Sequence, residues 1–133
     1  MTETHQLTDL QIAIMRVLWD RGEATVADIH EALLPERGLA PTTVATLLSR
    51  LEKRGVVKHQ SPARQYVYYP TVSEHEVRRS MVADLTERLF DGDVAQLVSH
   101  LLAAREISSG DLERVKELIA SHEARMEAPD EDR

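Results

Sequence analysis

The sequence predicts a mainly α-helical fold with one small β-hairpin, in 133 residues that include no cysteine. Three observations support this prediction. Helical apolar patterns with start and stop signals fill the first 55 residues, two short β-prone runs follow, and helical spacing returns from Ser73 onward. We therefore expect a first domain at residues 1–72, a helical second domain at 73–128 and a disordered tail at 129–133.

The first two helices are predicted from their N-terminal caps. Thr8, with Gln three residues later, forms a capping-box pattern ahead of a strongly apolar helix that should end at Gly22. Thr25, with Asp three residues later, starts a second helix in the same way, and Pro35 is expected to end it. The apolar stripe of the first helix includes Trp19, which we interpret as a core residue.

The third helix is predicted between Pro41, which suits a first helical turn, and Gly55. Its apolar positions are Val44, Leu47, Leu48 and Leu51. At about 100° per residue, the opposite strip holds Thr42, Thr46, Ser49 and Lys53, flanked by Thr43 and Arg50. This strip contains no acidic residue, whereas solvated helix faces usually carry glutamate and lysine together.

The β-prone runs are Val56 to Gln60 and Gln65 to Tyr69, joined by a turn that ends with Arg64. Three helices followed by a hairpin within about 70 residues are typical of a winged helix-turn-helix. Tyr68 and Tyr69 are expected to pack this hairpin against the helices.

The remainder of the chain reads as three short amphipathic helices, with a break at residues 90–93 and a cap at Ser108. Such helices cannot bury every apolar face in so small a unit, so we expect a symmetric homodimer. Folding back onto the first domain is the alternative. The residues predicted to dimerise are Met81, Leu85, Leu89, Leu97, Leu101, Leu112, Val115 and Ile119.

The net charge of −7 conceals a basic segment. Residues 37–64 hold six basic side chains and one acidic one, Glu52, for a net charge of +5, and both flanking segments are acidic. A positive surface of this kind favours a polyanion partner. The alternative is an ordinary surface segment that holds an excess of basic residues by chance.

The helix and the basic segment together predict binding of double-stranded DNA. Short threonines allow close approach to base edges in the major groove, and the basic residues suit phosphates. The predicted DNA-binding residues are Thr42, Thr43, Thr46, Ser49, Arg50, Lys53, Arg54, Lys58 and Arg64, with Tyr66 a weaker candidate. Because winged domains also bind proteins, an interaction module without DNA binding remains an alternative.

Enzymatic and metal-dependent functions find no support in the sequence. Three His-Glu pairs occur, at His30, His75 and His122, but none has a second histidine four residues after the first, as a helical zinc site requires. A phosphate-binding glycine loop and a nucleophile elbow are also missing. We expect no catalytic residue, cofactor or metal ion, with a His/Glu site across a dimer left open.

The opening residues MTETHQ are not expected to act as a signal peptide, and no apolar run approaches the roughly 18 residues of a membrane span. The expected location is the cytoplasm.

The segment LAPTTVATLLSRLEKRG (39–55) with YVYY (66–69) resembles the penicillinase and methicillin-resistance repressor family (BlaI/MecI), to which CopY-type copper repressors are related. The likeness extends from about residue 7 to 120. It implies a homodimeric repressor whose winged domains bind a dyad-symmetric operator with half-sites like TACA/TGTA. By the same resemblance, Thr43, Thr46 and Arg50 are recognition positions and Arg64 is the wing position. Thr42 and Ala45 replace charged residues of some members.

Two departures from the family concern release from DNA. Antibiotic-resistance members are released by proteolysis at an Asn-Phe bond, under control of a membrane sensor-protease, and the aligned pair here is His100-Leu101. The copper-responsive relatives use C-terminal cysteines, which this chain lacks, so copper-thiolate release is not expected. A regulator of the same fold that responds to another ligand or metal remains an alternative.

Overall fold

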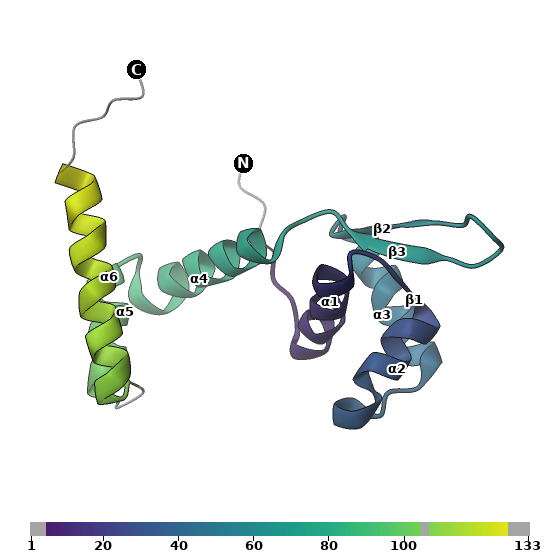
Figure 1. The fold of residues 1–133 in the computed structure, drawn as a ribbon, viewed down its shortest axis with the longest axis horizontal. Coiled ribbons are helices and arrows are strands. Elements are labelled where there is room, and N and C mark those ends of the chain that lie inside the picture. The colour runs from purple at the N-terminus through teal and green to yellow at the C-terminus, as the bar shows by residue number, and fades with distance from the viewer. Residues whose placement is uncertain (1–4, 105–106, 128–133) are drawn as a thin grey trace, which may run out of the picture. The chain divides into compact units, whose positions relative to one another are not determined.

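The computed structural model describes residues 5–104 and 107–127 and divides the chain into two compact units, which meet in sequence between Leu85 and Thr86. Helix α4 crosses that division (Figure 1). The elements are α1 Asp9–Arg21, β1 Ala24–Thr25, α2 Val26–Arg37, α3 Pro41–Lys53, β2 Val57–Gln60, β3 Val67–Pro70, α4 Glu74–Phe90, α5 Val94–Ala103 and α6 Ser109–Glu127. The mainly helical fold predicted from the sequence, a winged helix-turn-helix followed by further helices, is confirmed.

The predicted N-terminal caps form in α1 and α2, where Thr8 and Thr25 each complete a capping box. The predicted end of α2 at Pro35 is wrong. The helix continues through Pro35 to Arg37, and Gly38, at φ 30°, ends it by donating its N–H to the Leu34 carbonyl at 3.2 Å. A proline removes one backbone donor, but a helix ends where the chain turns left-handed, which here requires glycine.

The sheet has three antiparallel strands in the order β1-β3-β2, one strand more than the predicted hairpin. The additional strand is β1, whose Ala24 and Thr25 pair with Tyr68 and Val67 of β3. The hairpin itself forms, with strands slightly shorter than expected at residues 57–60 and 67–70. The sheet thereby connects the loop after α1 to the hairpin that follows α3.

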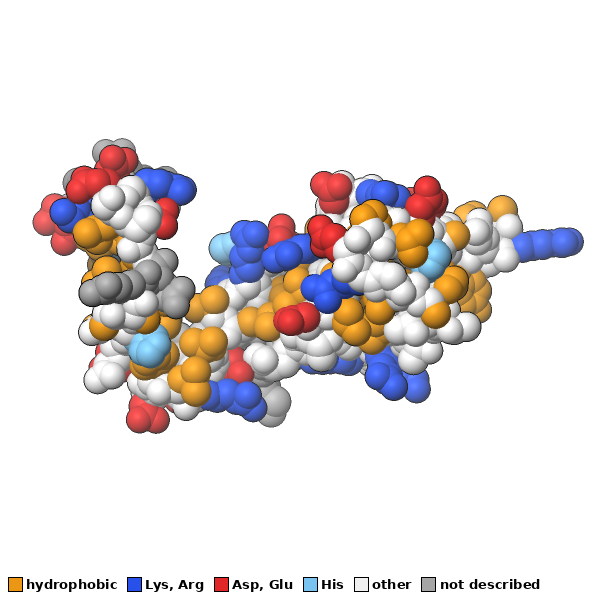
Figure 2. All heavy atoms as spheres, turned by 90° about the horizontal axis from the view of Figure 1, so that it is seen from below, with side chains coloured by type: hydrophobic (Ala, Val, Ile, Leu, Met, Phe, Trp, Pro, Cys, Tyr) orange, Lys and Arg blue, Asp and Glu red, His pale blue; other side chains and the backbone are white. Residues whose placement is uncertain are grey.

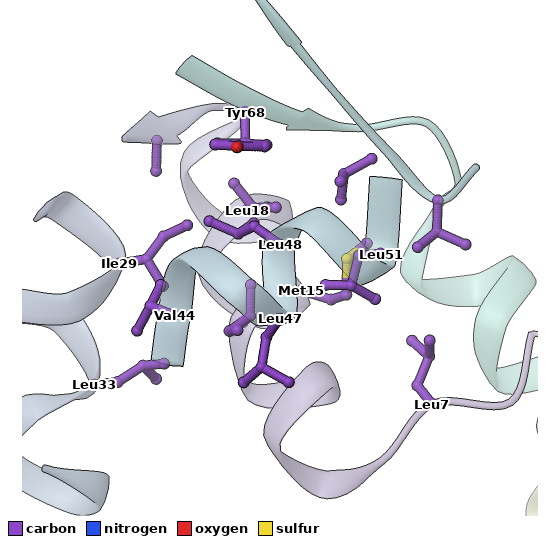
Figure 3. Close-up of a cluster of buried hydrophobic side chains, with 14 of the residues drawn as sticks. Leu7, Met15, Leu18, Ile29, Leu33, Val44, Leu47, Leu48, Leu51 and Tyr68 are labelled. Atoms are coloured by element: carbon purple, nitrogen blue, oxygen red, sulfur yellow. The ribbon is translucent and has the colours of Figure 1, made fainter. Parts of the chain in front are cut away.

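The core of the first unit lies among α1, α2, α3 and the sheet. Figure 3 shows Leu18 and Leu48 side by side beneath the ring of Tyr68. Trp19 is half-buried against this core, as interpreted from the sequence, and its indole N–H donates to the Val72 carbonyl at 2.8 Å. That hydrogen bond attaches the segment after β3 to α1. The fully buried side chains are Ile14, Met15, Leu18, Ile29, Val44, Leu48, Leu51, Val56 and Val57.

The second unit contains the end of α4 together with α5 and α6. Asp93 caps α5 through the Gln96 N–H at 3.1 Å, and Ser108 caps α6 through the Asp111 N–H at 3.1 Å. Neither α5 nor α6 buries a single side chain among those described. The tail predicted to be disordered at 129–133 lies outside the described residues.

No helix in the described parts of the chain combines the length and apolarity needed to cross a membrane.

Candidate nucleic-acid interface

Helix α3 presents the polar strip outward, as its periodicity predicts. Its four apolar residues are buried in the core, and these contacts fix the rotation of the helix about its axis. The predicted DNA-binding side chains on α3 are all exposed: Thr42, Thr43, Thr46, Ser49, Arg50 and Lys53. A shallow depression on this surface is lined by Thr42, Thr43, Thr46, Leu47 and Arg50. The strip is therefore accessible to a partner along its full length.

The hydroxyl group of Thr46 already has a partner within the helix. Its Oγ1 donates to the Thr42 carbonyl at 2.9 Å, one turn earlier. The hydroxyl proton is therefore engaged, and the oxygen lone pairs and the methyl group remain to face a ligand. At this position α3 can accept a hydrogen bond or make an apolar contact.

The C-terminal end of α3 is closed by a Schellman motif at Gly55, which has φ 80°. The Gly55 N–H donates to the Glu52 carbonyl at 3.0 Å, and the Val56 N–H donates to the Leu51 carbonyl at 3.1 Å. Because Val56 is buried, this turn directs the chain straight from the helix into β2. Arg54, exposed at the C-cap, lies at the same helix end as Arg50 and Lys53.

The hairpin carries two of the predicted residues. Lys58 is exposed on β2, and Arg64 is exposed in the loop between β2 and β3. Arg64 has φ 65°, a left-handed conformation that costs a non-glycine residue about 1–2 kcal/mol. Figure 2 shows a basic side chain extending from the hairpin end of the first unit and further basic side chains on the surface of that unit.

A cluster that the sequence did not predict connects α3 to the hairpin. Nδ1 of His59 lies 2.8 Å from Oε1 and 2.7 Å from Oε2 of Glu52, and the imidazole stacks on the Tyr66 ring at 4.0 Å and 17°. Tyr68 lies beside both rings, with centroids 5.6 Å from His59 and 6.2 Å from Tyr66. Burial raises the pKa of the Tyr68 hydroxyl, and the Glu52 carboxylate and Tyr66 add to that rise.

The side chains predicted to form the dimer interface fall in both units of the chain. Met81 packs against the core of the first unit, and Leu85 of the same unit is exposed to solvent. Figure 2 shows apolar side chains (orange) at the surface of the second unit. Leu89, Leu101 and Ile119, all three predicted to dimerise, are exposed in that unit. Leu97, Leu112 and Val115 are half-buried there. The unit thus retains an apolar surface that its own helices do not cover.

Among residues 5–104 and 107–127, no group of three or more histidine, aspartate or glutamate side chains is arranged so that it could hold a metal ion.

Comparisons with known proteins find similarity to a family of repressors. The family model described as penicillinase repressor matches residues 7–121. The chain is 22% identical over 125 residues to the penicillinase repressor of Bacillus licheniformis, covering 94% of this chain and 98% of that protein. It is 36% identical over 97 residues to the transcriptional regulator BlaI of Mycobacterium tuberculosis, covering 72% and 70%.

Among solved structures, the DNA-binding domain of the repressor BlaI in solution superposes with a TM-score of 0.50 at 28% identity. The superposed region covers 57% of this chain and 93% of that domain.

Proposed function

Because this chain belongs to the penicillinase repressor family, a family of transcriptional repressors, we propose that it binds a dyad-symmetric DNA operator as a homodimer. The similar domain of BlaI is itself a DNA-binding domain, which supports placing the DNA contacts in the first unit. The proposed partner is double-stranded DNA. In this proposal the protein acts by occupying its operator, without a catalytic step.

The observation that carries the proposal is the outward face of α3. It combines short hydroxyl side chains with a basic helix end, and none of its exposed side chains is acidic. Thr43 and Thr46 would contact base edges in the major groove, while Arg50, Lys53 and Arg54 would contact phosphates. Arg64 would bring a further positive charge to the DNA backbone beside the helix.

The surface of the second unit supports the homodimer. Exposed side chains such as Leu89, Leu118 and Ile119, at 70%, 64% and 52% exposure, are unusual for a monomer in water. A second copy supplies the same surface in return, as in any two-fold interface. Two recognition helices related by that symmetry would then contact two half-sites of one operator.

Fluorescence anisotropy with a labelled duplex from upstream of the chain's own gene tests DNA binding. We expect saturable binding that weakens steeply between 50 and 200 mM salt, because phosphate contacts release counterions. A shuffled duplex of equal length is the control. Equal affinity for the two duplexes, or binding to neither, would contradict the proposal.

Two variants separate the proposed contacts on that duplex. Arg64→Ala should weaken specific and shuffled DNA to the same extent, and lower the salt slope by about one. Thr46→Ala should reduce the preference for the specific duplex, by about fivefold for a contact worth about 1 kcal/mol. If Thr46→Ala weakens both duplexes equally, this residue does not contact a base.

Light scattering at micromolar concentration tests the dimer. A dimer has twice the 15.0 kDa mass of one chain. Ile119→Lys, which places a charge on the exposed apolar surface of α6, should shift the mass toward that of one chain. A wild-type particle with the mass of one chain would refute the homodimer.

We propose that release from DNA follows loss of the dimer, by proteolysis or another signal. Cleavage between His100 and Leu101, within α5, would separate α6 from the rest of the chain. A chain truncated after His100 should therefore bind one half-site as well as the full chain does, but the complete operator far more weakly. Unchanged operator affinity would show that dimerisation does not depend on α6.

A further inference from the structure

Glu52 is the only acidic residue among residues 37–64, and it lies on the recognition helix itself. Near a DNA backbone, a free carboxylate in this position would repel phosphates and weaken binding. Its side chain is one-third exposed, at 32%, and both of its oxygens lie within 2.8 Å of Nδ1 of His59. The carboxylate is therefore held by the hairpin and is not a free charge on the surface.

The geometry of the pair places a hydrogen on Nδ1 of His59. An ionised carboxylate only accepts hydrogen bonds, so Nδ1 must carry the hydrogen that is shared between the two Glu52 oxygens. The groups that face this ring are Glu52 from α3 and Tyr66 and Tyr68 from the hairpin.

The same ring lies at the base of the loop that carries Arg64. His59 belongs to β2, pairs in register with Tyr68 of β3, and stacks on Tyr66, the last residue before β3. The loop therefore leaves β2 one residue after His59 and returns at the residue on which His59 stacks. Fixing this ring fixes both ends of the loop.

Only the turn at residues 54–56 connects α3 covalently to β2. The base of the hairpin also packs on the helices, because Val57 and Tyr68 are buried in the core. Glu52 and His59 add an attachment two residues beyond Val57 along β2, nearer to the Arg64 loop. Resting on the proposed DNA binding, we infer that the Glu52–His59 pair is a positioning clamp, which holds the Arg64 loop at the angle to α3 that DNA requires.

The clamp predicts a result opposite to that of simple electrostatics. Removing an acidic charge beside DNA should strengthen binding, yet Glu52→Ala is expected to weaken it by about two- to fivefold, the range of a partly exposed ion pair. Glu52→Gln retains an oxygen that accepts the Nδ1 hydrogen and removes the charge. It should bind at least as tightly as the wild type.

Anisotropy titrations with a duplex that the wild-type chain selects from a random library measure these affinities, with circular dichroism to confirm folding. His59→Ala should weaken binding like Glu52→Ala without changing the salt slope. Lys58→Ala, on the neighbouring residue, is the matched control and should lower that slope by about one. In the double variant the losses should be less than additive, because one interaction is removed twice.

Hydrogen exchange of the free protein tests the clamp without DNA. In Glu52→Ala the amides of Ser61 and of residues 63–66 should exchange several-fold faster, while those in the middle of α3 keep their wild-type rates. Unchanged loop exchange, or DNA binding by Glu52→Ala as tight as that of the wild type, overturns the clamp. Failure of the wild type to select any duplex would refute the proposed function, and the exchange experiment would still decide whether the loop is held.

Discussion

Replacing Leu48 by alanine tests whether the buried face of α3 stabilises the core. Leu48 is fully buried, beside Leu18 and beneath the ring of Tyr68 (Figure 3). The change removes about three methylene equivalents at roughly 0.8 kcal/mol each, and the cavity left behind adds to this loss. We expect the free energy of unfolding of the first unit to fall by about 3 kcal/mol. That is a large share of the roughly 4–13 kcal/mol expected for 85 residues.

Urea unfolding followed by tryptophan fluorescence measures this loss. Trp19 is the single tryptophan of the chain and lies in the first unit, so its signal reports on that unit alone. For an m value of about 1.5 kcal/mol per molar, the midpoint should fall by about 2 M.

Thr46→Ala, on the opposite face of the same helix, is the control. Because Thr46 is exposed, its replacement should change stability by less than about 0.5 kcal/mol while it alters DNA preference. A loss below about 1 kcal/mol in Leu48→Ala would refute the view that the buried face of α3 fixes its polar strip.

Three further predictions concern the local structure. Gly55→Ala should destabilise the first unit by about 1 kcal/mol, because Gly55 has a φ of 80° that alanine adopts only with strain. Gly110→Ala, within α6 and without a positive φ, should be neutral or stabilising. Urea unfolding followed by circular dichroism compares the two variants. Trp19→Phe should cost about 1–2 kcal/mol, because the Val72 carbonyl loses its indole donor, and thermal unfolding measures the loss. Hydrogen bonds from the N-cap threonine of α2 lower the pKa of Asp28. The charged carboxylate therefore stabilises the fold at any pH above the pKa that Asp28 has in the unfolded chain. This stabilisation disappears as the pH falls through the lower pKa of the folded state. The difference in stability between the wild type and Asp28→Asn should therefore be present at pH 7 and shrink below pH 4, as denaturant titrations at both pH values would show.

The helices could be predicted because their signals are local. A threonine cap, a carboxylate or amide three residues later and an apolar period determine where α1 and α2 begin, without knowledge of the rest of the fold. The two-residue strand β1 carries no such signal. Ala24 and Thr25 become a strand only because the distant residues Tyr68 and Val67 lie beside them. A pairing of this kind leaves no periodicity in either segment.

The candidate site likewise has one part that local sequence signals predict and one part that depends on contacts between elements. Four buried residues fix one face of α3, and the helical period then places the threonines on the other, so the polar strip could be derived from sequence. The relation between Glu52 and His59 could not be, because they lie on different elements and meet only when the Schellman turn brings β2 back along the helix. In the sequence, Glu52 counts as one charge against DNA binding. In the fold, the same charge has a partner in the hairpin, so the sign of its effect on affinity depends on geometry that charge counting does not contain.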